Sequence, residues 1–383
     1  MRYRRLGRTG LEVSEIGLGT EYLEGMELEK VCEIIRTCEE QGINILDCWM
    51  PEPKVRSAIG ECIHARREHW IIQGHFGATW QDGQYVRTRE MTKVPEAFED
   101  FLTRMQTDYV DLGMIHYVDS LEEWDSIVSG PFLEYVHEMR DKGVIRHVGL
   151  SSHNPQVAKK AILSGEIEML LFSINPAFDL MPTTEEVKDY FAAENYGDSL
   201  AGMDPEREEL YRLCEQQDIG ITVMKGYAGG RLFKPETSPF GVALTPVQCI
   251  HYCLTRPAVA SVLAGYSEPE HVLEAVAYET AGEEEKNYAA VLATAPRHAF
   301  TGKCMYCNHC KPCPINIDIG MVNKLYDLAE VAEGEVPASI REHYKALAVK
   351  ASDCIACGGC EERCPFGVPV MERMELAKGL FGE

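Results

Sequence analysis

The sequence lacks long hydrophobic runs and has few basic residues for its size. No window of the 383 residues approaches about 18 uninterrupted apolar positions, and the opening MRYRRLGRTG has no apolar segment of the kind that directs secretion. We therefore expect a cytoplasmic protein with no membrane span. Lys and Arg number 37 against 61 Asp and Glu, and the net charge of −24 argues against binding to nucleic-acid phosphates or to an anionic membrane.

Cysteine, by contrast, is abundant and unevenly distributed. Eight of the fifteen cysteines fall in two short runs, Cys304-x2-Cys307-x2-Cys310-x2-Cys313-Pro314 and Cys354-x2-Cys357-x2-Cys360-x3-Cys364-Pro365. An odd total in a long chain that we expect to be unsecreted argues against a disulfide framework and for metal ligation or catalysis. Two-residue spacing lets successive thiolates converge from a tight loop, so the two runs are predicted to ligate two [4Fe–4S] clusters.

The two runs resemble those of two-cluster bacterial ferredoxins, in which the fourth cysteine of each run ligates the other cluster. The resemblance implies one cluster held by Cys304, Cys307, Cys310 and Cys364, and a second held by Cys354, Cys357, Cys360 and Cys313. Structural zinc is the alternative, but a zinc ribbon is built from two separated pairs of ligands, whereas each run has four cysteines together. Residues 315–353 carry apolar residues at helical spacing, so residues 298–383 are predicted to form a small, mainly helical ferredoxin-like domain.

The first three hundred residues show short apolar runs that alternate with amphipathic helical patterns, which is typical of a parallel sheet. The predicted strands are Glu15–Leu18, Ile43–Asp47, Trp70–His75, Val110–Ile115, His147–Leu150, Leu170–Ile174, Ile221–Lys225 and Ala260–Ala264. Helical patterns follow at 28–41, 54–65, 93–106, 133–142, 155–164, 205–218, 245–255 and 268–279. Eight such units in roughly 280 residues predict an α/β fold, a (β/α)8 TIM barrel over residues 1–297. A doubly wound sheet is the alternative, but no GxGxxG follows the first strand.

Polar residues at the carboxyl ends of the strands are the candidates for a site, because a barrel carries its active site there. Asp47, His75 and His116 end three consecutive strands and are the strongest candidates. A lone polar residue at a strand end is more often a helix cap, and Asn154 before PQVAKKAIL fits that role.

Several motifs stand out along the chain besides the cysteine runs: MRYRRLGRTGLEVSEIGLGT, GINILD, TDYVDLGMIH, IRHVGLSSHN and ITVMKGYAGGRL. With these motifs and the cysteine runs, the sequence resembles the aldo-keto reductases, in the branch whose barrel is followed by a dicluster ferredoxin-like domain. That family reduces carbonyls with NAD(P)H and uses an Asp, a Tyr, a Lys and a His, with the Tyr hydroxyl as proton donor. Asp47 and His116 match the Asp and the His. Glu52 stands at the position of the Tyr and His75 at that of the Lys, so the resemblance implies a non-standard acid/base set.

The predicted catalytic residues are therefore Asp47, Glu52, His75 and His116. His75 and His116 are expected to donate protons or to orient the substrate, with Asp47 as their partner, and Glu52 exchanges protons near neutral pH if burial raises its pKa. A metal bound by these four side chains is the alternative, because two histidines and a carboxylate also make a metal site.

The resemblance also implies a nicotinamide site. Its residues would be Ser151 and Ser152 at the nicotinamide amide, Asn175 in the Asn-Pro pair that ends the sixth strand, Lys225 and Gly229 near the pyrophosphate, and Gly265 at the start of the segment around the adenosine. Glu268 and Glu270 stand where a 2′-phosphate would require Arg or Lys, so NADH fits at least as well as NADPH. A pocket that no longer binds a nicotinamide is the alternative.

Three further predictions concern single features. We expect Cys48, Trp49 and Trp80 to line the pocket mouth. The alternative for Cys48 is that it is a small hydrophobic residue, as a buried Cys usually is. The scattered cysteines Cys32, Cys38, Cys62, Cys214, Cys249 and Cys253 lie on helical patterns and are predicted to belong to the core. Residues 179–204 are expected to be a long connection that acts as a lid or as a dock for the ferredoxin-like domain.

These patterns favour an iron–sulfur oxidoreductase in which the barrel exchanges electrons between an organic substrate, or a nicotinamide, and two [4Fe–4S] clusters. Its partners would be a small-molecule substrate and a redox protein that presents a basic patch to the acidic surface. Two alternatives stay open: a non-catalytic electron carrier or redox sensor with a degenerate barrel, and a lyase or isomerase with structural clusters.

Overall fold

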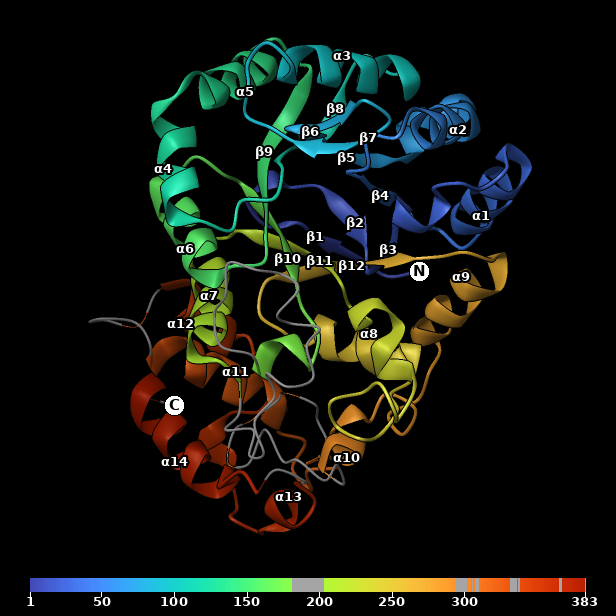
Figure 1. The fold of residues 1–383 in the computed structure, drawn as a ribbon. Helices are drawn as coiled ribbons and strands as arrows, with labels where there is room; N and C mark the ends of the chain where they lie inside the picture. Colours follow the sequence, from blue (N-terminus) through green and yellow to red (C-terminus); the bar gives the residue numbers. More distant parts are fainter. Residues whose placement is uncertain are drawn as a thin grey trace.

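Eight parallel strands close into a barrel (Figure 1), as the sequence predicts. The structure, a computed structural model, describes residues 1–180, 203–293, 302, 304, 306, 310–330, 336, 338–364 and 367–382. Around the barrel the strands follow the order β10-β11-β12-β3-β4-β5-β8-β9, so the barrel strands pair in the order of the chain and β12 closes the ring on β3. Their bounds are β3 Ile16–Gly19, β4 Ile45–Cys48, β5 Ile71–Phe76, β8 Val110–Ile115, β9 Ile145–Ser152, β10 Met169–Ser173, β11 Gly220–Met224 and β12 Val259–Gly265. Each predicted strand overlaps one of these.

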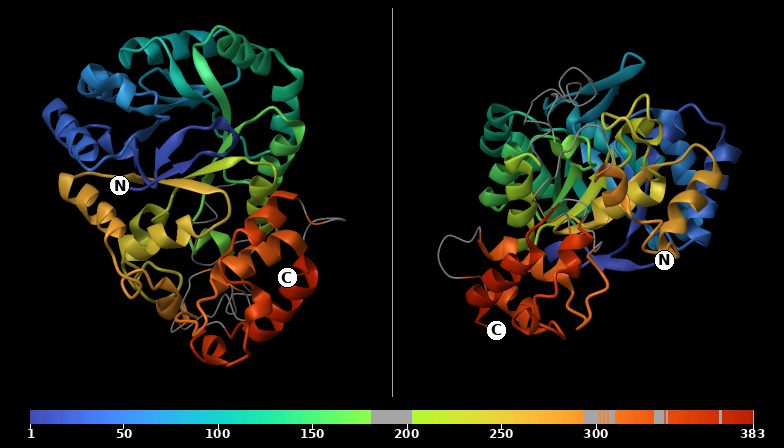
Figure 2. Two further views of the ribbon diagram at one scale, coloured as in Figure 1. Left: turned by 180° about the vertical axis from the view of Figure 1, so that it is seen from behind. Right: turned by 90° about the horizontal axis from the view of Figure 1, so that it is seen from below.

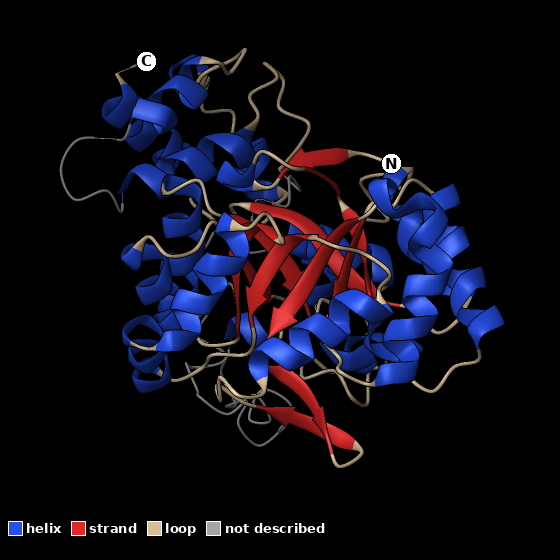
Figure 3. Ribbon diagram, turned by 90° about the horizontal axis from the view of Figure 1, so that it is seen from above, coloured by secondary structure: helices blue, strands red, loops and turns tan. Residues whose placement is uncertain are grey.

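Helices surround the strands on the outside (Figure 3), and the predicted helical patterns are confirmed. They are α1 Leu28–Glu40, α2 Pro53–Ile63, α3 Val94–Arg104, α4 Leu121–Ser129, α5 Pro131–Asp141, α6 Pro155–Ser164, α7 Pro205–Gln216, α8 Pro246–Leu254 and α9 Pro269–Val276. All except α1 and α4 carry Pro at the first or second position, where a missing N–H costs no hydrogen bond. Asn154 caps α6 as predicted, since its side chain accepts from the N–H groups of Gln156 and Val157.

Two features of the barrel region were not predicted. Helix α4 precedes α5, and a hairpin made of β6 (Ala78–Gln81) and β7 (Gln84–Arg87) follows β5. The hairpin projects from one end of the barrel, whereas the hairpin of β1 (Tyr3–Arg5) and β2 (Glu12–Ser14) lies at the other end (Figure 2). Gly7 follows β1 with a φ of 50°, and a Cβ there would lie 2.1 Å from the amide nitrogen of Gly220. Only glycine therefore allows this close approach at the strand-start end of the barrel.

The C-terminal region is mainly helical. It contains α10 Tyr288–Ala293, α11 Ile319–Glu330, α12 Ala338–Lys345, α13 Gly359–Glu362 and α14 Val370–Phe381. Helix α11 packs against α12 and α14. The predicted boundary between residues 297 and 298 lies outside the described residues and stays a prediction, as does most of the connection 179–204. Among the described residues, no helix combines the length and the apolar character that crossing a bilayer requires.

The C-terminal region contacts the barrel at the end where the barrel strands begin. The Lys324 ammonium lies 3.9 Å from the Glu215 carboxylate, and the Gln216 side chain donates to the Leu328 carbonyl at 3.4 Å. Glu215 and Gln216 end α7, and a helix of a βα unit ends where the next strand starts. In agreement, the C-terminal region lies toward the β1–β2 hairpin and away from the β6–β7 hairpin (Figure 2).

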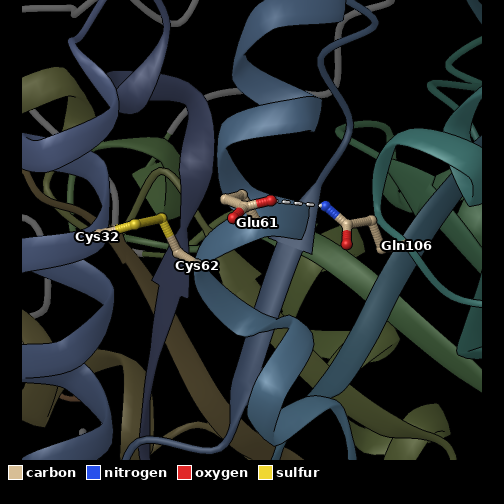
Figure 4. The surroundings of a disulfide bond; sticks show 4 residues. All are labelled: Cys32, Glu61, Cys62 and Gln106. Carbon is tan, nitrogen blue, oxygen red and sulfur yellow. Dashed lines mark hydrogen bonds between the residues drawn. A yellow bond between two sulfur atoms is a disulfide. The ribbon is translucent and has the colours of Figure 1, made fainter.

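Two of the scattered cysteines do not belong to the core. Cys32 on α1 and Cys62 on α2 are half-buried and form a disulfide (Figure 4), which corrects the prediction for this pair. The helices pack side by side, and the Cα atoms of the two cysteines are 5.0 Å apart. Beside the disulfide, the Gln106 amide donates to Glu61 at 3.0 Å. Cys38, Cys214, Cys249 and Cys253 are buried free thiols, as predicted.

A buried ion pair fixes α7 against the end of β10. The Arg207 guanidinium donates to Asp179 Oδ1 at 2.9 Å and to the Ser173 carbonyl. The hydroxyl of Tyr252, on α8, donates to Asp179 Oδ2 at 2.6 Å. Arg207 and Asp179 are both 0% exposed, so each charge depends on the other for its solvation.

Asp179→Asn should therefore destabilise the fold strongly, because it removes the negative charge from a fully buried ion pair with Arg207. We expect a loss of about 3–5 kcal/mol in the free energy of unfolding, measured by chemical denaturation. Asp218→Asn is the matched control, since Asp218 pairs with Arg5 at the surface and its loss should cost less than about 1 kcal/mol. Equal losses in the two variants would contradict this account of Asp179.

Candidate functional site

A cavity of about 980 Å³ opens at the carboxyl ends of the barrel strands. Its floor includes the ends of β4, β5, β8 and β11, and its walls come from the loops that follow them. Predicted residues that line it are Asp47, His75, His116, Ser151, Lys225, Gly229 and Gly265. The cavity therefore lies at the carboxyl ends of the strands, where the sequence analysis expects a site.

Three of the four predicted catalytic side chains are in direct contact. His75 Nε2 lies 2.8 Å from Asp47 Oδ1, and His75 Nδ1 lies 2.9 Å from His116 Nδ1. Asp47 is 6%, His75 2% and His116 5% exposed, so these contacts are largely shielded from water. The side-chain amide of Gln73 also donates to Asp47 Oδ1 at 2.8 Å, which fixes the carboxylate.

Glu52 does not join this cluster. It is the N-cap of α2, where its Oε2 accepts the Val55 N–H at 2.7 Å, and it is not among the residues that line the cavity. Among the described residues, no three His, Cys, Asp or Glu side chains are placed to hold a metal ion. The four predicted residues therefore do not fit the alternative of a metal site.

The hydroxyl of Tyr85 completes a chain of hydrogen-bonding groups. Tyr85 is not among the residues that the sequence predicts for the site. Tyr85 lies on β7, and its hydroxyl is 2.8 Å from His116 Nε2. The signal for the hairpin was present as Asp82-Gly83, a dipeptide that favours two-residue hairpin turns. Both turn residues have positive φ, 51° and 79°, which that turn requires.

Aromatic rings form one wall of the cavity around His116. The Trp49 ring stacks on the His116 ring with centroids 5.6 Å apart, and its edge meets Tyr85 at 5.3 Å. Trp49 lines the cavity as predicted, whereas Trp80 and Cys48 do not. Cys48 is fully buried, and burial raises its pKa to about 11, so it behaves as a small hydrophobic residue.

Burial and positive neighbours keep His116 neutral. Loss of hydration, together with the nearby His75, Arg89 and Arg87, holds the pKa of His116 well below its usual value. Arg89 also donates to the His116 carbonyl, so it fixes the residue at the end of β8. Burial raises the pKa of Tyr85 to about 12, so its hydroxyl keeps its proton at neutral pH.

The predicted nicotinamide residues divide into two groups. Ser151, Lys225, Gly229 and Gly265 line the cavity. Ser152 is 0% exposed and donates to Asp119, and Asn175 is 0% exposed and donates to the Lys225 carbonyl at 2.9 Å. Ser152 and Asn175 therefore hold the loops that carry the site and do not face the cavity.

A second polar pair, made of His153 and Asp119, lies beside the predicted serine. His153 lines the cavity, and its Nδ1 is 2.9 Å from Asp119 Oδ2. Burial alone would raise the pKa of Asp119, but the contacts with the His153 ring and backbone N–H hold it below its usual value. Asp119 thus orients the His153 ring and is a fixed negative charge behind the cavity wall.

The cysteine-rich region contains a second, narrow cavity. It is lined by Cys313, Cys354, Cys357 and Cys360, together with Arg363 and apolar side chains. These are the four residues that the ferredoxin resemblance groups into one cluster. Ala356 and Gly358 have φ of 49° and 76°, and these left-handed residues wind the second run around the cavity.

The other predicted cluster is described only in part. Cys304, Cys310 and Cys364 are half-buried, whereas Cys307 lies outside the described residues. Cys304 lies against α7 in a small cavity with Tyr211 and Arg256, on the barrel side of the region. The Arg363 guanidinium donates to the Cys310 carbonyl at 2.9 Å and so ties the first run to the second.

Comparison with known proteins places this chain in a family. The sequence profile of the aldo/keto reductase family matches residues 15–245. The uncharacterized oxidoreductase YqkF of Bacillus subtilis (strain 168) is 30% identical over 288 residues, 72% of this chain and 90% of the relative.

Solved structures show the same fold. An aldo-keto reductase from Bacillus halodurans in its holo form has a TM-score of 0.60 and 24% identity, covering 75% of this chain and 94% of that one. A putative aldo-keto reductase from Pseudomonas aeruginosa has a TM-score of 0.55 and 22% identity, covering 72% and 93%. The chain belongs to the aldo/keto reductase family of oxidoreductases.

Proposed function

We propose that this chain is an iron–sulfur oxidoreductase whose barrel cavity binds a small organic substrate with a nicotinamide, and whose C-terminal cysteines hold two [4Fe–4S] clusters. The observation that carries the iron–sulfur part is the grouping of Cys313 with Cys354, Cys357 and Cys360 around one cavity. Cys313 comes from the first run and the other three from the second, which is the exchange of ligands that the ferredoxin resemblance implies.

The spread of the cysteines around the cavity supports the proposal of a cluster over that of a single ion. The described thiols are not placed to share one metal ion, but each thiolate of a [4Fe–4S] cluster binds a different iron, so its ligands surround a volume. Cys313, Cys354, Cys357 and Cys360 would hold one cluster and Cys304, Cys307, Cys310 and Cys364 the other. The clusters would supply one-electron transfer.

In the barrel, the side chains at the strand ends bind and move protons. Asp47 and His75 can hold a proton between Oδ1 and Nε2, and His116 extends this contact toward the cavity. Trp49 and Tyr85 cover His116 and keep water from it. A bound nicotinamide would supply or accept a hydride. A cavity of about 980 Å³ is large enough for such a cofactor and a small substrate.

The two proposed centres lie toward opposite ends of the barrel. The cavity is at the carboxyl ends of the strands, and the cysteine region contacts the residues that precede the strands. Cys357 and Ile355 are exposed, and Ile355 is 60% accessible, so the second run is open to a redox partner. This placement favours a second candidate function, an electron carrier whose barrel does no chemistry.

Iron analysis tests the cluster assignment. The anaerobically purified chain should contain about eight iron and eight sulfide ions, and Cys313→Ala should contain about half as many. Cys249→Ala is the matched control, because Cys249 is a buried free thiol of α8 outside both runs. Zinc without sulfide in the wild-type protein, or equal iron in both variants, would show the assignment to be wrong.

Anaerobic titration with NADH separates the two candidate functions. For the oxidoreductase we expect NADH to bleach the visible absorbance of the clusters, because the barrel passes the electrons of a hydride on to them. For a carrier with an inactive barrel, dithionite would bleach the absorbance and NADH would not. The same titration with His75→Ala and His116→Ala shows whether the site at the strand ends is needed.

The cavity also predicts which nicotinamide binds. Glu274 on α9 lines the cavity, whereas Glu268 pairs with Lys30, and neither Glu268 nor Glu270 is among the lining residues. A 2′-phosphate would meet the Glu274 charge, so NADH should bind more tightly than NADPH.

Glu274→Gln should improve NADPH binding about fivefold and leave NADH binding unchanged, as measured by calorimetry. Glu270→Gln on the same helix is the control and should change neither affinity. Tighter binding of NADPH than of NADH by the wild-type chain would contradict this interpretation.

A further inference from the structure

The cavity contains a phenol that the predicted acid/base set does not use. Tyr85 lines the cavity from β7, is 37% exposed, and places its hydroxyl 2.8 Å from His116 Nε2. The position that the family resemblance assigns to a proton-donating Tyr holds Glu52, which caps α2 instead. Tyr85 thus brings a hydroxyl to the site from a different part of the chain.

Four groups form one continuous chain of contacts. Asp47 Oδ1 meets His75 Nε2 at 2.8 Å, His75 Nδ1 meets His116 Nδ1 at 2.9 Å, and His116 Nε2 meets the Tyr85 hydroxyl at 2.8 Å. A neutral imidazole has one N–H and one lone pair, so each contact fixes the next. With Asp47 as a carboxylate, His75 donates through Nε2, His116 donates through Nδ1, and the Tyr85 hydroxyl donates to His116.

One additional proton reverses the direction of two of these contacts. When the proton is held between Asp47 and His75, His75 Nδ1–H donates to His116 Nδ1, and His116 Nε2–H donates to the Tyr85 oxygen. The Tyr85 O–H is then free to point into the cavity. The chain therefore has two arrangements that differ by one proton, and only one of them offers the hydroxyl to a substrate.

We propose that Tyr85 is the proton donor of this site and is reprotonated through His116 and His75 from the Asp47–His75 pair. The proposal rests on the proposed oxidoreductase function and names the catalytic acid for reduction of a carbonyl by a reduced nicotinamide. Asp47, His75 and His116 act behind Tyr85 as a path for the proton.

The step balances in protons and electrons. A bound reduced nicotinamide would supply the hydride that forms the C–H bond at the carbonyl carbon. The Tyr85 O–H bond breaks as its proton binds the carbonyl oxygen. The proton on His116 Nε2 moves to Tyr85, and the proton on His75 Nδ1 moves to His116 Nδ1. The net result is one proton transferred from the Asp47–His75 pair to the substrate oxygen. Alcohol oxidation runs through the same steps in reverse.

The electrostatics of the two central groups suit this transfer. Burial and neighbouring charges keep the pKa of His116 well below its usual value, so His116 passes a proton on and does not retain it. Tyr85 keeps its proton until negative charge develops on the substrate oxygen, because an alkoxide is a stronger base than a phenolate.

The hairpin that carries Tyr85 is held by hydrogen bonds within itself and to the barrel. The Thr79 hydroxyl donates to the Val86 carbonyl at 2.7 Å within the hairpin, and Arg87 donates to the Tyr117 carbonyl at 2.8 Å. Tyr266 also lines the cavity, but its hydroxyl donates to the Gly17 carbonyl at 3.2 Å. The contact with His116 therefore distinguishes Tyr85 from Tyr266.

Tyr85→Phe tests the proposal, because it removes the hydroxyl and keeps the ring against Trp49. With NADH and with 4-nitrobenzaldehyde, butanal and cyclohexanone as carbonyl probes, kcat should fall about 10²- to 10⁴-fold, with KM changed less than about threefold. Tyr135→Phe is the matched control, because Tyr135 lies on α5 with its ring edge against Phe76, outside the cavity. It should retain the wild-type kcat.

A second measurement does not depend on turnover. In 15N-histidine NMR spectra, Tyr85→Phe should move the His116 Nε2 signal toward that of an unbonded imidazole nitrogen, while Tyr135→Phe leaves it in place. NADH binding and the bleaching of the cluster absorbance should be the same in Tyr85→Phe as in the wild type, because neither requires a proton on a carbonyl oxygen.

The outcomes separate this proposal from the function on which it rests. If the wild-type chain reduces the probes and Tyr85→Phe keeps its kcat within about threefold, Tyr85 is not the donor although the proposed function stands. An unchanged His116 signal in Tyr85→Phe overturns the assignment in the same way. If the wild-type chain reduces none of the probes and NADH bleaches nothing, both proposals are wrong.

Discussion

Backbone pairing of the barrel strands is the constraint on which the site depends. Asp47 on β4 pairs in register with Gln73 on β5, and His75 on β5 pairs with Met114 on β8. A closed ring of parallel strands brings their carboxyl ends to one side, so polar residues up to seventy positions apart in the chain become neighbours. The contacts among Asp47, His75 and His116 follow from this register together with the buried position of each side chain.

Burial turns this proximity into fixed orientation. The Thr222 hydroxyl on β11 donates to the Gln73 amide oxygen at 2.9 Å, and the Gln73 amide N–H donates to Asp47. This polar path crosses the barrel interior among apolar residues such as Leu112, Met114 and Leu171. Because a buried polar group without a partner is costly, the interior holds the Asp47 carboxylate in one position and, through it, the tautomer of His75.

The sequence predicted the elements of the barrel more completely than the directions of its side chains. Periodicity located all eight strands, and Asp47, His75 and His116, which were chosen for their place at strand ends, line one cavity. It could not separate Ser151 from Ser152. Successive residues of a strand face opposite sides, and here only Ser151 faces the cavity. Glu52 was assigned by its distance from Asp47 in the chain, but Pro53 starts α2 there and makes Glu52 its cap.

Long-range contacts account for the remaining differences. Tyr85 reaches His116 only because β6 and β7 fold back over the strand ends, and no local pattern at residue 85 contains that information. Cys32 and Cys62 meet because α1 packs on α2, although each lies on an ordinary helical pattern. Cys313 and Cys354 come from different cysteine runs and line one cavity, as the ferredoxin resemblance implies for ligands that share a cluster. Patterns set by local chemistry can thus be read from the sequence, whereas residues brought in by packing of distant elements require the structure.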